Sequence, residues 1–199
     1  MVVAAVLGLS HIVAAAHAAE WCDQVAGGDA ALLSKGEPLV RSKADPEGGS
    51  GVIEGCIDIP VAPATLWELM LDCAKAKQFL EDLVECRVTE RDSAGAWDVR
   101  EQVMDVSALL PNLRSVFRSD YTLHREIRFR QLSGNLDLME GHWRLRPFAD
   151  GQSTRLTYRA RIASSLPVPD SLIRSILAGE APRTLTLLRR EAIAMGAPR

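Results

Sequence analysis

The sequence predicts an α+β fold in which one antiparallel sheet packs against a long C-terminal helix, and three observations lead to this prediction. Residues 167–195 place apolar side chains at three- and four-residue spacing, the pattern of an amphipathic helix. Residues 83–162 alternate between apolar and polar side chains in segments separated by short turns, which is typical of antiparallel strands. One more alternating segment, residues 51–59, comes before them. A long amphipathic helix needs a surface on which to bury its stripe, and the sheet supplies it.

The predicted C-terminal helix has one apolar face and one charged face. Asp170 is a residue type that caps helix N-termini, and Pro169 or Ser171 suits a first turn. The apolar face consists of Leu172, Ile173, Ile176, Leu177, Ala181, Leu185, Leu188, Ala192 and Met195. Pro182 has no N–H for the carbonyl four residues before it, so we expect a kink near residues 178–179.

Seven strands and two short helices are predicted before the long helix. The strands occupy residues 51–59, 83–91, 96–106, 114–124, 126–132, 139–146 and 154–162. The short helices, residues 64–71 and 76–80, both lie between the first and second strands. Residues 30–35 and 37–41 are candidates for a helical turn and a further short strand. Consecutive strands joined by short turns indicate an antiparallel meander.

The two faces of the predicted sheet differ in polarity. The face toward the helix carries large rings, such as Phe117 and Trp143, together with small residues. The small residues are Gly55, Ser119, Gly141 and Ala160. Such a mixed surface either leaves a hollow or interdigitates into a solid core, and the residues alone favour neither. The opposite face carries many arginines, which we interpret as a solvated face with cross-strand pairs rather than as a binding stripe.

Charge and composition narrow the classes of function. The chain of 199 residues has a net charge of −3 and dispersed arginines, so nucleic-acid binding is not expected. Residues 1–19 contain an apolar stretch followed by Ala-His-Ala, which predicts a cleavable signal peptide and a periplasmic or secreted protein. The alternative is an uncleaved anchor helix, for which the segment is short. Residues 20–50 are predicted to form an N-terminal arm and linker, and residues 51–196 the domain.

The search for chemical motifs predicts no cofactor and no metal site. The four histidines are scattered, and no spacing matches a metal site, a nucleophilic triad or a phosphate-binding loop. Glu101 and Asp105 fall on one face of the third predicted strand, where a buried carboxylate would serve as a general acid or base. The alternative is that both are hydrated at the rim of the sheet. We therefore assign no catalytic residue.

The four cysteines of a chain predicted to be exported indicate two disulfides. Cys56 points to the outer face of the first strand and Cys86 to the inner face of the second, which argues against pairing them. Cys73 lies at the corner between the short helices, beside the second strand. We therefore predict a Cys73–Cys86 disulfide, with Cys22–Cys56 as the remaining pair that holds the arm over the first strand. The alternative leaves Cys22 or Cys56 as a free thiol.

Three stretches of the chain resemble the START-like, helix-grip superfamily, also called SRPBCC, which includes polyketide cyclases and coenzyme Q-binding proteins. They are residues 57–92, which begin IDIPVAPATLWELM, residues 136–162, LDLMEGHWRLRPFADGQSTRLTYRARI, and residues 166–191, LPVPDSLIRSILAGEAPRTLTLLRRE. The resemblance covers about residues 51–195. It implies a seven-stranded curved antiparallel sheet that wraps around the C-terminal helix, with an apolar cavity between them. It does not imply a reaction, because members bind lipids, quinones, sterols, hormones or polyketides and only some are enzymes.

The function expected from these features is non-catalytic binding, and transport, of an apolar small molecule such as a lipid or an isoprenoid quinone. The candidate cavity residues are Trp67, Met70, Glu101, Val103, Asp105, Phe117, Ser119, Tyr121, Phe129, Gln131, Met139, Trp143, Tyr158, Leu172 and Ile176. One alternative is a cyclase/aromatase-type enzyme that uses Glu101, Asp105 or Tyr121 as acid or base. Another is an interaction module with a filled core.

An apolar loop at residues 107–111 is predicted at the rim of the sheet. It is interpreted as packing against the C-terminal helix, and the alternative is a cavity gate or a tip in transient contact with a membrane. We expect the protein to be a monomer or a weak dimer.

Overall fold

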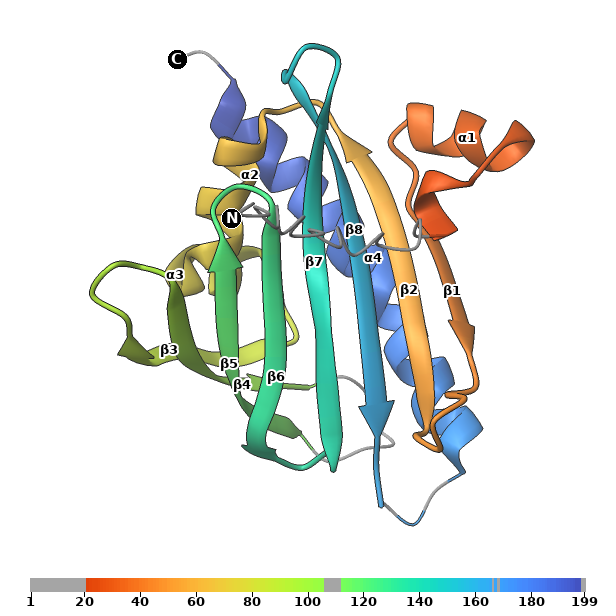
Figure 1. The fold of residues 1–199 in the computed structure, drawn as a ribbon, viewed down its shortest axis with the longest axis vertical. Helices are drawn as coiled ribbons and strands as arrows, with labels where there is room; N and C mark the ends of the chain where they lie inside the picture. Colours follow the sequence, from red (N-terminus) through yellow and green to blue (C-terminus); the bar gives the residue numbers. More distant parts are fainter. Residues whose placement is uncertain (1–20, 106–111, 166, 168, 198–199) are drawn as a thin grey trace, which may run out of the picture.

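The computed structural model describes residues 21–105, 112–165, 167 and 169–197, which form one curved sheet covered by helices (Figure 1). The helices are α1 (Gly27–Ser34), α2 (Pro63–Leu71), α3 (Cys73–Phe79) and α4 (Asp170–Gly196), preceded by a short 3-10 helix η1 (Trp21–Asp23). The strands are β1 (Leu39–Lys43), β2 (Gly51–Ile59), β3 (Leu83–Arg91), β4 (Trp97–Met104), β5 (Leu113–Thr122), β6 (Glu126–Gly134), β7 (Leu138–Phe148) and β8 (Ser153–Ala163). The predicted α+β class, with an antiparallel sheet and a long C-terminal helix, is confirmed.

The sheet has the strand order β1-β2-β8-β7-β6-β5-β4-β3, and every neighbouring pair is antiparallel. Strand β2 pairs with β8 from Gly51↔Ile162 to Ile59↔Thr154, so the first and last long strands lie side by side. The sheet therefore has eight strands, and the predicted count of seven is wrong. The additional strand is β1, whose five residues are too few for alternation to be clear in a sequence. The edge of β2 supplies its hydrogen bonds.

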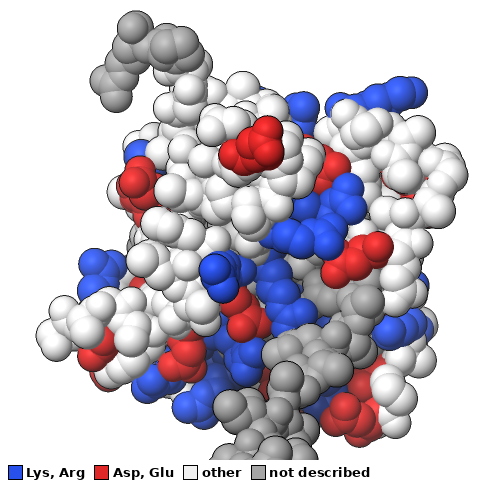
Figure 2. Space-filling model, turned by 45° about the horizontal axis from the view of Figure 1, so that its top comes forward, with Lys and Arg blue, Asp and Glu red and all other residues white. Residues whose placement is uncertain are grey.

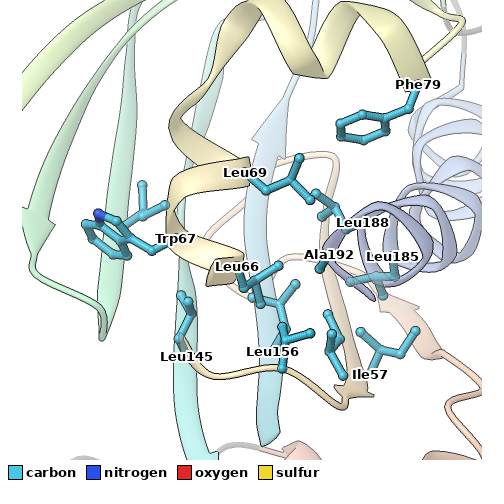
Figure 3. Packing of buried hydrophobic residues seen from close by; sticks show 13 residues of the cluster. Ile57, Leu66, Trp67, Leu69, Phe79, Leu145, Leu156, Leu185, Leu188 and Ala192 are labelled. Atoms are coloured by element: carbon cyan, nitrogen blue, oxygen red, sulfur yellow. The ribbon is translucent and has the colours of Figure 1, made fainter. Parts of the chain in front are cut away.

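Helix α4 buries its apolar stripe on the inner face of the sheet, where α2 also packs (Figure 3). The shared cluster contains Ile57, Leu66, Trp67, Leu69, Leu145, Leu156, Leu185, Leu188 and Ala192. All of these are at most 7% exposed. Each large apolar side chain buried in this way stabilises the fold by about 1.5–3 kcal/mol relative to leaving it in water.

The start of α4 differs from the prediction by one residue. Pro169, with φ −58° and ψ 137°, occupies the N-cap position, and Asp170 is the first helical residue. The prediction that Asp170 caps the helix is wrong because its carboxylate has another partner, accepting a hydrogen bond from Ser50 Oγ at 2.6 Å. The helix is continuous across residues 178–179, and Pro182 lies inside it. The kink stays a prediction.

The short helix α3 begins three residues earlier than predicted. Asp72 has an extended backbone, and its carboxylate accepts the backbone N–H of Lys75 at 3.0 Å. This is the hydrogen bond that defines an N-cap, so the helix starts at Cys73. The early start places Cys73 opposite β3.

The N-terminal arm covers part of the outer face of the sheet. Cys22 of η1 forms a disulfide with Cys56 of β2, with a Cα–Cα distance of 6.2 Å. Cys22, Leu33, Leu39 and Cys56 form one small buried cluster. Helix α1 lies beside the end of β1 in Figure 1. The interpretation of the outer face as wholly solvated is therefore wrong over β1 and β2, because the arm buries apolar side chains there.

The second disulfide joins Cys73 of α3 to Cys86 of β3, with a Cα–Cα distance of 5.3 Å. Both predicted cysteine pairs are thus present. Two disulfides are typical of proteins from an oxidising environment. The predicted signal peptide, residues 1–19, lies outside the described residues.

We expect protein prepared from an oxidising compartment to carry both disulfides. Mass spectrometry of the intact chain before and after reduction should show a gain of four hydrogens, two for each disulfide. The Cys22–Cys56 pair is buried and Cys73–Cys86 is half-buried, so mild reductant should cleave Cys73–Cys86 first. Four free thiols in the unreduced protein would contradict this expectation.

The rest of the outer face carries arginines paired with acids on neighbouring strands. Arg155 donates to Asp58 at 2.7 Å, and Arg144 donates to Glu126 at 3.0 Å. Figure 2 shows Lys and Arg next to Asp and Glu on the face that it presents. This agrees with the interpretation of cross-strand pairing on a solvated surface. Within the described residues, no helix combines the length and the hydropathy needed to cross a membrane.

Candidate functional site

A hollow with two adjoining lobes lies between the inner face of the sheet and helix α4. We call them lobe A, of about 190 Å³, and lobe B, of about 200 Å³. The two lobes share five lining residues, Gln102, Met104, Phe117, Trp143 and Thr184. Helix α4 packs directly on β1 and β2 at one side of the sheet. Both lobes lie toward the other side, where β4, β5 and β7 line the space beneath the helix.

Lobe A is mostly apolar and uses the middle of α4 as one wall. Its other lining residues are Ile53, Leu113, Ser115, Leu136, Met139, Tyr158, Ile162, Leu177, Glu180, Ala181 and Leu185. The ring of Tyr158 lies 4.3 Å from that of Trp143, centroid to centroid, and the two form an aromatic wall. Burial raises the pKa of Tyr158, which keeps its hydroxyl protonated.

Lobe B is bounded by α2, α3 and the start of β3. Its other lining residues are Leu69, Met70, Leu71, Ala76, Phe79, Leu80, Leu83, Arg100, Ser119, Ile127, Phe129 and Leu188. The Cys73–Cys86 disulfide closes the loop that supplies Ala76, Phe79, Leu80 and Leu83 to this lining. The disulfide therefore helps to hold one wall of lobe B in place.

The one charged side chain in the described lining of lobe B is Arg100, and it is ion-paired with Asp98. Arg100 Nη2 donates to Asp98 Oδ2 at 2.7 Å and to Tyr121 Oη at 3.0 Å. The side chains of Arg100 and Asp98 are 6% and 2% exposed. Burial is the largest single influence and opposes the charge on Arg100, but the hydrogen bonds and charge interactions with Asp98 and Tyr121 together outweigh it, and the pKa of Arg100 is raised. Burial raises the pKa of Tyr121. The group is therefore an ionised pair next to a neutral phenol.

Glu101, Val103 and Asp105 do not line the cavity, and their predicted placement is wrong. The register of β4 with β5 pairs Arg100 with Phe117 and Gln102 with Ser115, so the even-numbered residues of β4 face inward. Glu101 and Val103 therefore point to the outer face. Asp105 is exposed beyond the end of β4.

On the outer face, Glu101 lies between two arginines. Its carboxylate accepts from Arg87 Nε at 2.7 Å and from Arg114 Nε at 2.6 Å. The hydrogen bond from Arg87, aided by Arg114 and opposed by burial, holds the pKa of Glu101 below its ordinary value of 4.5. These arginines come from β3 and β5, so the carboxylate ties three strands together.

This depressed pKa predicts a loss of stability in acid. A carboxyl whose pKa is lower in the folded chain stabilises the fold above pH 4.5 and loses that contribution as pH falls through the folded value. We expect the thermal unfolding midpoint of the wild type to decrease as the pH is lowered below about 4.5. The Glu101→Gln variant should show a smaller decrease over the same pH range. The exposed Glu90→Gln serves as the control. An unchanged pH profile for Glu101→Gln would contradict the expectation.

Seven predicted cavity residues do line the hollow: Met70, Phe117, Ser119, Phe129, Met139, Trp143 and Tyr158. Five others lie elsewhere: Trp67, Tyr121, Gln131, Leu172 and Ile176. Trp67 packs edge-on against Tyr121, with centroids 5.7 Å apart, and Gln131 accepts from Ser115 Oγ at 3.2 Å. Leu172 and Ile176 come before the first residue of α4 that lines a lobe, Leu177.

Sequence reasoning found Ser119 but missed the other polar residues of the hollow, which include Arg100, Gln102, Glu180 and Thr184. The small residues of the inner face, for which the sequence left a hollow and close packing as alternatives, include two glycines that serve close packing. A Cβ on Gly55 would lie 3.2 Å from Leu185 Cδ1, and a Cβ on Gly141 would collide with the carbonyl oxygen of Arg159. These glycines let α4 approach β2 and β8 approach β7. Among the described residues, no group of three or more His, Cys, Asp or Glu is placed to hold a metal ion.

Solved structures with this fold come from several bacteria. A protein from Thermus thermophilus has a TM-score of 0.65 and 20% identity, covering 73% of this chain and 99% of that one. A STAR-related lipid transfer protein from Xanthomonas axonopodis has a TM-score of 0.65 and 18% identity, covering 79% and 94%. The Zhui aromatase/cyclase from Streptomyces sp. R1128 has a TM-score of 0.61 and 17% identity, covering 78% and 94%. At these identities the similarity shows the START-like helix-grip fold alone.

Comparison with curated protein sequences finds no match. The family model described as polyketide cyclase / dehydrase and lipid transport matches residues 59–189, which is more than half of the chain and includes most residues that line both lobes. With the helix-grip fold and the hollow beneath α4, this match establishes that the chain belongs to the polyketide cyclase / dehydrase and lipid transport family, within the START-like superfamily.

Proposed function

We propose that the protein binds an apolar small molecule, such as a lipid or an isoprenoid quinone, in the hollow between the sheet and α4, and carries it without chemical change. The observation that supports this is the pair of adjoining lobes with mostly apolar lining. A poorly soluble ligand gains about 25 cal/mol for each Å² of apolar surface removed from water, so a lined hollow is sufficient for binding.

The cyclase alternative has less support, because the residues that were candidates for its chemistry are placed elsewhere. Glu101 is on the outer face between Arg87 and Arg114. Asp105 is exposed beyond β4, and Tyr121 is bonded to Arg100 outside both lobes. General acid–base catalysis requires the group to reach the reacting atom at hydrogen-bond distance. The interaction module with a filled core also has less support, since the two lobes are hollow.

Native mass spectrometry of the purified protein, followed by solvent extraction and lipid analysis, tests the proposal. A co-purifying apolar species that is lost on denaturation would support carriage and identify the ligand class. A protein that is empty as purified and takes up no apolar fluorescent probe would contradict it.

A matched pair of substitutions on α4 tests whether the ligand binds in lobe A. Ala181 lines lobe A and Ala194 is exposed on the same helix. We expect Ala181→Phe to fill the lobe and weaken probe binding at least about tenfold, since overpacked side chains displace a ligand, at a stability cost of about 1–3 kcal/mol. Ala194→Phe should bind normally. Full binding by a folded Ala181→Phe variant would show that the ligand occupies another site.

A further inference from the structure

Lobe B contains two hydroxyl groups that have no partner in the described part of the chain. Ser119 is 2% exposed and lines lobe B from β5, and Thr184 lines it from α4. Neither hydroxyl is bonded to another described residue. Other hydroxyls near them are paired, since Ser115 Oγ donates to Gln131 at 3.2 Å and Thr186 Oγ1 donates to Pro182 O at 2.8 Å. Ser119 reaches the lobe from a buried position and Thr184 from a half-buried one, so both hydroxyls are free to bond a ligand that enters lobe B.

Arg100 adds an unused donor to the same lobe. A guanidinium has five N–H groups, and here Nε donates to Asp98, Nη2 donates to Asp98 and Tyr121, and Nη1 donates to Met70 O at 3.4 Å. One N–H of Nη1 is left over. Gln102 also lines the lobe, and its amide makes only a 3.7 Å contact with Cys86 Sγ. Donors and acceptors from β4, β5 and α4 therefore converge on one apolar hollow.

The charge of this site is balanced before any ligand enters. Arg100 is the one charged residue in the described lining of lobe B, and the buried carboxylate of Asp98 neutralises it. A ligand carboxylate or ammonium would be buried without a counter-charge, which is costly. An uncharged oxygen loses little on transfer, because Ser119 and Thr184 replace its hydrogen bonds to water.

We propose that lobe B recognises an uncharged oxygen-bearing group, such as a ketone, ester or alcohol, at one end of an elongated apolar ligand whose hydrocarbon body lies in lobe A. Ser119 and Thr184 are the residues that determine this specificity. The inference rests on the proposed binding function and narrows its ligand class from any apolar molecule to an uncharged, oxygenated one. It excludes free fatty acids as the preferred cargo.

Displacement of an apolar fluorescent probe by four compounds of equal chain length tests the inference. The compounds are undecane, methyl nonyl ketone, undecanol and undecanoate, used near pH 7, where only the last is charged. The ketone and the alcohol should bind about three- to tenfold more tightly than undecane, which is the net value of one or two hydrogen bonds. Undecanoate should bind more weakly than both. Undecanoate binding as tightly as the ketone would overturn the inference.

Three variants connect the preference to the named hydroxyls. Ser119→Ala and Thr184→Val should each weaken binding of the ketone and the alcohol about threefold or more and leave undecane unchanged. Thr186→Val is the control, because Thr186 is exposed on the same helix as Thr184 and lines neither lobe. Equal losses for undecane and the ketone, or no loss in either variant, would overturn the inference. If undecane and all its analogues fail to bind, the proposed function itself fails; if undecane binds with no preference among the four, only this inference fails.

Discussion

Asp98→Ala is expected to destabilise the protein by about 3–5 kcal/mol, because it leaves the Arg100 guanidinium buried without its counter-charge. The side chain of Arg100 is only 6% exposed, so water cannot replace the three contacts that Asp98 makes with Nε and Nη2. Urea unfolding followed by circular dichroism measures the change. The double variant Asp98→Leu with Arg100→Met should cost much less than Asp98→Ala alone, since both charges are removed together.

The neighbouring strand offers a control with the same spacing. Arg118 and Asp120 of β5 are also two residues apart and ion-paired, but they face outward with side chains 29% and 47% exposed. Asp120→Ala should therefore cost at most about 1 kcal/mol, as exposed pairs do. Equal costs for Asp98→Ala and Asp120→Ala would show that the inner pair is hydrated and that lobe B is open to water.

The fold was largely predictable because its strands bury one face. In β8, Leu156, Ala160 and Ile162 are at most 2% exposed, and the arginines between them lie outside. Such alternation predicts both that the segment is a strand and which of its side chains point toward the core. Strand β1 was not predictable as a certain strand, because it is short and its conformation depends on the edge of β2.

Apart from Ser119, the site was predictable only where its lining is apolar or aromatic. In β4 the inward positions carry Asp98, Arg100 and Gln102, whereas Val99 and Val103 point outward. Alternation alone assigns the valines to the inside, and it cannot recognise two charged side chains that satisfy each other after folding. Glu101 points outward in the same register, where it pairs with Arg87 and Arg114. These partners come from neighbouring strands, so the sequence of β4 alone does not predict this orientation.

A second large effect is expected when a core leucine of β8 is shortened. Leu156 is fully buried, packs in the main cluster and lines neither lobe. Leu156→Ala should therefore cost about 3–5 kcal/mol, the sum of lost apolar transfer and the cavity left behind. Met139 of β7, which is half-buried, lines lobe A. Met139→Ala should cost about 2 kcal/mol or less, at the low end for such a change, because one side of Met139 already faces a hollow.

Urea unfolding of both variants, without and with a saturating apolar ligand, distinguishes a core wall from a cavity wall. Ligand should raise the stability of the wild type and of Leu156→Ala by the same amount, because binding adds free energy to the native state only. It should raise the stability of Met139→Ala by a different amount, since that substitution alters the lining of lobe A. If Met139→Ala costs as much as Leu156→Ala in the empty protein, then lobe A is closed without ligand. Its walls would then pack on each other as a core does, and binding would have to open them.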